Sequence, residues 1–201
     1  RVKESVNLKT GEYATSAPAK LESVDAAKGG LRALVTHKDR GGKFAWATLS
    51  KMLAYAAALV PEIADDIVSV DLAMKAGFNW KRGPFEMIDQ LGAAWFAERL
   101  AAEGVAVPSL LAAAAAQGGF YKIASEGVLQ LGADGSHKPI LRQSGTMQLS
   151  DIKRLGKPLA KNASASVWDV GDGVACLEFH SKMNTLDPDS LTMLMQALEI
   201  T

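Results

Sequence analysis

Cysteine and histidine are scarce in this chain of 201 residues, which has one cysteine, Cys176, and three histidines. A single cysteine excludes an internal disulfide and a zinc site built from several cysteines, and it indicates a reducing, cytoplasmic compartment. Charge of one sign is also lacking, because 22 basic and 22 acidic residues give a net charge of zero. Since phosphate binding needs clustered cations, we expect neither nucleic acid nor an anionic membrane surface as a partner.

Long hydrophobic runs are absent as well. A membrane span requires roughly 20 apolar residues, whereas the longest stretch of low polarity, residues 105–116, is short and mostly alanine. Residue 1 is arginine rather than methionine and no signal peptide follows it, which is typical of a piece cut from a longer chain. The length and the 48% hydrophobic content predict a sizeable core that needs no metal or disulfide.

A complete active-site motif is missing too. Gly171-Asp172-Gly173 has the start of a dinucleotide-binding fingerprint, but Cys176 stands where the third glycine is required, so a hairpin turn is the better interpretation. The histidines His37, His137 and His180 are far apart, and none has a partner at ligand spacing. We therefore predict no catalytic residue, no metal ligand and no NAD-binding residue in this chain.

What is present is a helical pattern between two less regular ends. Four parts are expected: a linker or surface segment over 1–23, a helical domain over 24–118, a β-hairpin and connector over 119–160, and a last part over 161–201. The fold class is mostly α, with a small β-rich C-terminal part made of a hairpin and a helix.

Apolar residues recur at spacings of three and four over 49–60, which predicts a long helix ended by Pro61. A second helix follows, with carboxylates at Asp65 and Asp66 and a stop at Gly77. Pro84 suits the first turn of a third helix. Two more helices are expected, to residue 103 and to residue 117, the latter carrying an alanine run.

After residue 119 the pattern changes to short strands at 120–124 and 128–132, a turn at Asp134-Gly135 and a short helix within 149–158. The strongest hairpin signal in the chain lies around Asp172-Gly173. An amphipathic helix over 190–198 follows it.

One set of residues has a distinctive spacing within 42–92. An aspartate is followed by a glycine six positions later, a Gly-Pro-Phe triplet, and a further aspartate and glycine: Asp71, Gly77, Gly83, Pro84, Phe85, Asp89 and Gly92. This tract, about a quarter of the chain, resembles the C-terminal helical domain of 3-hydroxyacyl-CoA dehydrogenases. From the residues themselves, Asp71 is a capping or turn charge, and the Gly-Pro-Phe triplet has a structural role.

A second stretch, 168–198, combines a DGVA-type turn, an apolar strand, the loop residues Asn184, Leu186 and Asp187, and a helix. It resembles the opening of the enoyl-CoA hydratase (crotonase) family. The order of the two stretches is similar to that in bifunctional bacterial β-oxidation enzymes. In the crotonase family the preceding loop lies near CoA, which implies Ser181, Lys182 and Met183 as CoA contacts.

These resemblances imply a central fragment of an NAD-dependent oxidoreductase of fatty-acid β-oxidation. The implied partners are an acyl-CoA substrate, a Rossmann domain that would bind NAD, the rest of a hydratase domain, and a second copy in a homodimer. The fragment alone is expected to be inactive. The alternative is a non-catalytic helical binding or dimerisation module that reuses the same fold. Because an isolated hairpin is marginal in water, we also predict that the hairpin at 166–180 pairs with the strands of 119–142 or with another chain.

Overall fold

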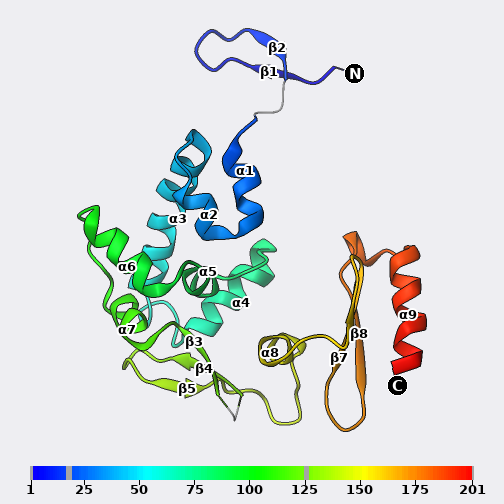
Figure 1. The fold of residues 1–201 in the computed structure, drawn as a ribbon. Helices are drawn as coiled ribbons and strands as arrows, with labels where there is room; N and C mark the ends of the chain where they lie inside the picture. Colours follow the sequence, from blue (N-terminus) through cyan, green and yellow to red (C-terminus); the bar gives the residue numbers. More distant parts are fainter. Residues whose placement is uncertain (1, 17–19, 125–126, 201) are drawn as a thin grey trace.

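The structure is a computed structural model that describes residues 2–16, 20–124 and 127–200 (Figure 1). Its α-helices are α1 (Glu22–Ala26), α2 (Leu31–Thr36), α3 (Arg40–Ala58), α4 (Ile67–Phe78), α5 (Pro84–Leu91), α6 (Ala93–Ala102), α7 (Ser109–Gln117), α8 (Leu149–Leu155) and α9 (Pro188–Ile200), with 3-10 turns η1 (Ala27–Gly29) and η2 (Lys182–Asn184). Its strands are β1 (Glu4–Val6), β2 (Tyr13–Thr15), β3 (Tyr121–Ala124), β4 (Gly127–Leu131), β5 (His137–Pro139), β6 (Ala160–Lys161), β7 (Ala165–Asp169) and β8 (Ala175–Phe179). The predicted class, mostly helical with a small β part, is confirmed.

The long helix α3 forms as its apolar spacing predicts. The Asp39 side chain caps it by accepting a hydrogen bond from the Gly42 amide at 2.8 Å, which satisfies a free N–H of the first turn. Leu53 is fully buried in the middle of the helix, and the helix ends before Pro61. Burial of one such leucine side chain contributes roughly 1.5–3 kcal/mol, so packing rather than propensity holds the helix.

Helix α4 ends later than the sequence predicts. Asp66 caps its start by accepting a hydrogen bond from the Ser69 amide at 2.7 Å. Gly77, expected as the stop, lies inside the helix, and Asn79 instead takes the left-handed conformation, with φ 53°. That prediction was wrong because asparagine also tolerates this conformation at a helix end.

The main core lies between the helices and the β3–β4–β5 sheet. Phe85 from α5 and Phe120 from the start of the sheet are fully buried, with ring centroids 4.8 Å apart in an edge-to-face arrangement. Leu131 of β4 belongs to the same core. The core therefore continues from the helices into the residues beyond 118.

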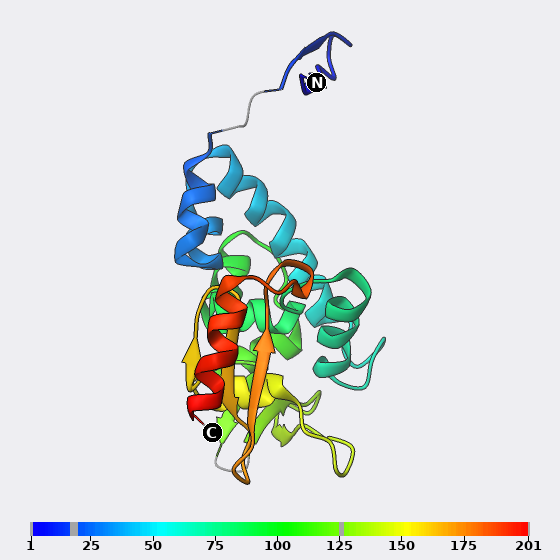
Figure 2. The same ribbon diagram turned by 90° about the vertical axis from the view of Figure 1, so that its right-hand side faces the viewer.

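The second sheet has the order β6–β7–β8 and shares no strand with β3–β4–β5 among the described residues. The predicted pairing of the 166–180 hairpin with strands of 119–142 is therefore wrong, and its alternative, pairing with another chain, stays a prediction. Strand β7 pairs with both β6 and β8, and α9 covers one face through Met193 (Figure 2). The turn is as expected, since Asp172 and Gly173 have φ of 53° and 73°.

The first 23 residues contain a feature that the sequence did not predict. Strands β1 and β2 form an antiparallel hairpin at one end of the molecule, and all six strand residues are exposed (Figure 1). Helix α1 already begins at Glu22, and Ser23 is fully buried.

Candidate functional site

Asp71 is a buried carboxylate that α4 directs at the start of α5. It accepts hydrogen bonds from the amides of Phe85 and Glu86, at 2.9 and 3.2 Å, and from the Tyr121 hydroxyl at 2.8 Å. Burial raises the pKa of Asp71 to about 6, against the opposing effect of these donors. A Cβ on Gly83 would overlap this carboxylate, so only glycine fits there. Asp71 is thus a cap for a neighbouring helix, and this contact explains the Gly-Pro-Phe triplet.

Asp89, on α5, has the matching role toward the sheet. Its two carboxylate oxygens accept hydrogen bonds from the amides of Phe120 and Tyr121, at 2.7 and 2.8 Å. Burial raises the pKa of Asp89 to about 6, while the two amides favour the ionised form. Gly119 passes close by with φ +137°, and a Cβ there would make a tight contact, 3.0 Å, with the nearer Asp89 carboxylate oxygen.

Glu86 holds three elements together at the edge of this region. Its carboxylate accepts hydrogen bonds from Lys75 Nζ at 2.8 Å and from the Arg154 guanidinium of α8. The same guanidinium lies over the Tyr121 ring, with its Cζ 4.6 Å from the ring centroid. Burial alone would raise the pKa of Glu86. Hydrogen bonds from Lys75 and the Gly83 amide, with the positive charges of Lys75 and Arg154, hold this pKa below its usual value.

Two of the predicted family residues lie outside this network. Gly77 is exposed on α4, and Gly92, with φ 85°, joins α5 to α6. The predicted CoA contacts Ser181, Lys182 and Met183 lie at the turn η2, where Met183 is 90% exposed and the Ser181 hydroxyl donates to the Thr185 carbonyl. None of them lines the five best-formed cavities of the described residues, and their contact with CoA stays a prediction.

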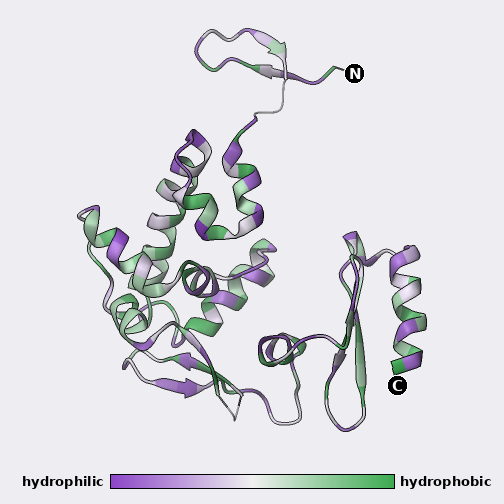
Figure 3. Cartoon of the chain, in the orientation of Figure 1, coloured by the Kyte–Doolittle hydropathy of each residue, from purple (hydrophilic) through white to green (hydrophobic). Residues whose placement is uncertain are grey.

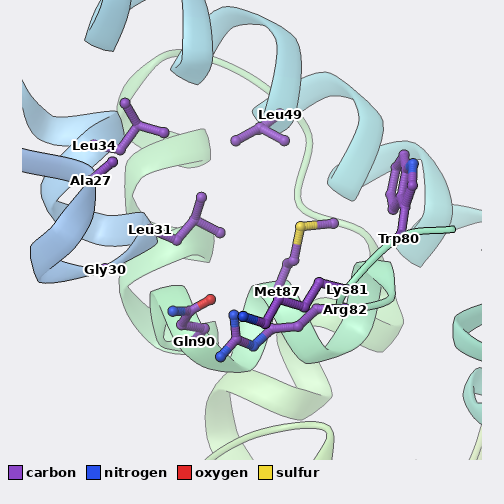
Figure 4. Close-up of a pocket in the computed structure, with 10 residues that line it drawn as sticks. All are labelled: Ala27, Gly30, Leu31, Leu34, Leu49, Trp80, Lys81, Arg82, Met87 and Gln90. Atoms are coloured by element: carbon purple, nitrogen blue, oxygen red, sulfur yellow. The ribbon is translucent and has the colours of Figure 1, made fainter. Parts of the chain in front are cut away.

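The sequence did not point to the cavity shown in Figure 4. It has a volume of about 440 Å³ and is bounded by η1, α2, α3, α5 and the segment between α4 and α5. Its lining is mostly apolar, with three cationic or amide side chains: Ala27, Gly30, Leu31, Leu34, Leu49, Trp80, Met87, Lys81, Arg82 and Gln90. The sequence signal that could have indicated this cavity is the pair of adjacent cations, Lys81 and Arg82, before the Gly-Pro-Phe triplet.

Lys81 and Arg82 also border a second cavity, of about 430 Å³. Its other charged residues come from α4, α5, α8 and β8: Lys75, Glu86, Lys153, Arg154 and Glu178. Both carboxylates there are already paired, Glu86 with Lys75 and Arg154, and Glu178 with Lys153 at 2.8 Å. The surplus charge of this region is therefore positive.

The cavity of Figure 4 is lined by groups that suit binding. The described residues that line the cavity in Figure 4 include no carboxylate, histidine or cysteine. In the part of the chain that the structure describes, no three histidine, cysteine, aspartate or glutamate residues are grouped to hold a metal ion. The same residues form no helix that is long and apolar enough to cross a membrane.

Residues 42–106 match the sequence model of the family described as "3-hydroxyacyl-CoA dehydrogenase, C-terminal domain". This stretch, about a third of the chain, is therefore similar to that domain. It contains α4, α5 and α6 and both Asp71 and Asp89, so the family match covers the helices that carry the two capping aspartates.

Relatives of known name extend this result. A "Probable 3-hydroxyacyl-CoA dehydrogenase" from Bacillus subtilis is 37% identical over 203 residues, which cover 98% of this chain and 26% of the relative. A "Putative fatty acid oxidation complex trifunctional enzyme" from Rickettsia felis is 32% identical over 44% of the chain and 12% of its own length. The chain thus spans at most about a quarter of these proteins. No solved structure matches the chain.

Proposed function

We propose that this chain is the substrate-side and assembly part of an NAD-dependent 3-hydroxyacyl-CoA dehydrogenase of fatty-acid β-oxidation, acting in the cytoplasm. The similarity to the Bacillus subtilis protein, at 37% identity over 98% of the chain, is the observation that carries the proposal. The similarity of residues 42–106 to the dehydrogenase C-terminal domain supports it independently.

The proposal assigns NAD to a Rossmann domain outside this chain. In the oxidation of a 3-hydroxyacyl-CoA, NAD accepts the hydride of the hydroxyl-bearing carbon. The described residues do not suit the dinucleotide, because Gly171-Asp172-Gly173 forms the hairpin turn between β7 and β8 rather than the junction of a strand and a helix. No step of the reaction is therefore assigned to residues of this chain.

The contribution of this chain is rigid support of a binding surface. Asp71, Glu86 and Asp89 fix α4, α5, α8 and β3 against one another, and the cavity of Figure 4 lies against the outer side of α5 and its entry segment. A scaffold with locked side chains positions a substrate more precisely than a loose one.

The last part, residues 161–201, is proposed as the beginning of a crotonase-like hydratase domain. The observed hairpin and following helix, β7, β8 and α9, have the order that the resemblance implies. The alignment with the Bacillus subtilis relative covers nearly all of this chain, which supports a common arrangement of the two parts.

The test is to assay the longer protein encoded with this chain and the 201-residue chain side by side, using 3-hydroxybutyryl-CoA and NAD. We expect NADH formation by the longer protein and none by the chain alone, because positioned acid–base groups are required. Hydration of crotonyl-CoA tests the hydratase part separately. If the longer protein oxidises no 3-hydroxyacyl-CoA and hydrates no enoyl-CoA, the alternative of a non-catalytic binding or dimerisation module replaces this proposal.

A further inference from the structure

We propose that the cavity of Figure 4 binds an aliphatic chain that carries an anionic group, with the chain against Leu34, Leu49 and Met87 and the anion at Lys81 and Arg82. The inference deepens the proposed function by locating an acyl-binding site within this chain. It rests on the proposed function only for the identity of the ligand, because the shape and charge of the cavity stand without it.

The apolar wall comes from three helices that do not close over it. Leu31 of α2, Leu49 of α3 and Met87 of α5 are half-buried and pack with one side on the main core. Their other sides face the cavity, together with Leu34 and the Trp80 ring (Figure 4). A volume of about 440 Å³ lies in the range of small-molecule sites, which are mostly apolar with a few placed polar groups. Burial of an aliphatic chain here removes apolar surface of both partners from water.

The polar end is formed by two cations that have no partner among the residues described by the structure. Lys81 and Arg82 are exposed, and their side chains take part in none of the hydrogen bonds or ion pairs found among the described residues. Their neighbours differ: Lys75 and Arg154 are both bound to Glu86. The two free cations thus offer charge-assisted hydrogen bonds to a ligand.

The backbone holds these cations at the cavity edge. Asn79 in the left-handed conformation ends α4, and the Trp80 amide donates a hydrogen bond to the Met74 carbonyl. At the other end, Gly83 packs so closely on Asp71 that only glycine fits there. The segment 80–82 is therefore fixed at both ends. In Figure 4 the Arg82 side chain extends toward Gln90, whose side-chain amide lies beside it.

The lining also predicts what the cavity rejects. Because no described carboxylate lines it, a cationic head group would meet Lys81 and Arg82 without compensation. A neutral alcohol of the same chain length would gain the apolar contacts alone. The expected order of affinity is therefore anion, then neutral chain, then cation.

The experiment measures binding to the 201-residue chain by equilibrium dialysis with decanoate, decanoyl-CoA, decanol, decyltrimethylammonium and CoA without an acyl group. We expect both anionic chains to bind more tightly than decanol, with affinity that falls as ionic strength rises. A free carboxylate and an acyl-CoA phosphate are both anions that Lys81 and Arg82 can bind. Tighter binding of decanoate or of decanoyl-CoA identifies which of them is the ligand.

Variants test the two ends separately. The double substitution Lys81→Ala and Arg82→Ala should weaken the binding of anionic chains by about tenfold or more, as expected for the loss of charge-assisted bonds, and leave decanol unchanged. Leu34→Trp should fill the cavity and abolish the binding of every chain. Leu34 is suitable because it is not among the residues packed on the main core.

The matched control removes the same charge elsewhere. Arg40 and Lys43 are exposed in the first turn of α3 and line none of the cavities, so their double substitution to alanine should change no affinity. Circular dichroism and urea midpoints verify the fold of each variant, and the salt dependence of the unmodified chain gives a second measurement. Equal binding of decanoate and decanol, no binding of any chain, or full affinity after loss of both cations would overturn the proposal. The assay reads no dehydrogenase activity, so its failure and the failure of the proposed function are distinguishable.

Discussion

Two regions of the molecule bury their residues in different ways: the helical body, which is α1 to α7 with the β3–β4–β5 sheet, and the C-terminal sheet, which is β6–β7–β8 with α9. In the body, fully buried aromatic and aliphatic side chains lie around the buried Asp71 and the half-buried Asp89, and each aspartate accepts hydrogen bonds from the backbone of another element. In the sheet, the core consists of Ala165, Val167 and Met193, and most of α9 stays exposed. Figure 3 shows hydrophobic and hydrophilic residues alternating along α9. The body therefore combines a large apolar core with polar contacts between its elements, whereas the sheet has a small apolar core beside hydrogen bonds such as that from the Ser164 hydroxyl to Asp187.

The largest expected effect comes from the closest approach in the body. Gly83→Ala places a Cβ on the buried Asp71 carboxylate, and we expect a loss of about 3 kcal/mol or more in the free energy of unfolding. Gly77→Ala is the matched control, because a Cβ there meets no atom and the position is helical. It should stabilise the chain by about 0.5–1 kcal/mol. Urea unfolding of both variants measures the contrast, and equal effects would contradict it.

The next effect tests the small core of the sheet. Met193 is 1% exposed and Met195, two residues later on α9, is 63% exposed. Met193→Ala should cost about 2 kcal/mol or more in the stability of the sheet, whereas Met195→Ala should change little. Hydrogen exchange of the amides of 167–179 should become faster only in the first variant, with exchange in α3 and α5 unchanged. Rapid exchange across 167–179 in the unmodified chain would show that α9 does not stabilise the hairpin.

The smallest effect concerns pH and belongs to the body alone. The pKa values of Asp71 and Asp89 are raised from 3.8 to about 6 in the folded chain. The folded state therefore binds these protons more tightly, so their contribution to stability is present below pH 3.8 and is lost as pH rises through about 6. Each group should lower the free energy of unfolding by about 1 kcal/mol between about pH 5 and 7.

Asp89→Asn isolates one of these groups. The variant should unfold more easily overall, because asparagine has one acceptor for the two amides of Phe120 and Tyr121. Its stability should also change less between pH 5 and 7 than that of the unmodified chain. Urea unfolding at several pH values measures both, and an unchanged pH slope would assign the titration to other groups.

Sequence reasoning succeeded where one element carries its own signal. The spacing of Leu49, Met52 and Leu53 predicted α3, Pro84 predicted the start of α5, and Asp172-Gly173 predicted the last turn. It failed where contacting residues lie far apart in the sequence or where an element is very short. The cavity joins Leu31, Leu49 and Met87 from three helices, and β6 has only two residues, too few to be recognised as a partner of β7. The Asp71 acceptor role depends on donors up to 50 positions away.

The hydrogen bonds of Asp89 have a practical meaning for fragment design. A helical fragment ended at residue 118 would leave this half-buried carboxylate without the Phe120 and Tyr121 amides and would expose the space filled by the Phe120 ring. Extending the fragment through β5 keeps these amides, and it keeps the hydrogen bond from the Gln117 side chain to the Gly135 carbonyl. Because Arg154 of α8 binds Glu86 of the body, the sensible place to divide this chain for expression lies between α8 and β6.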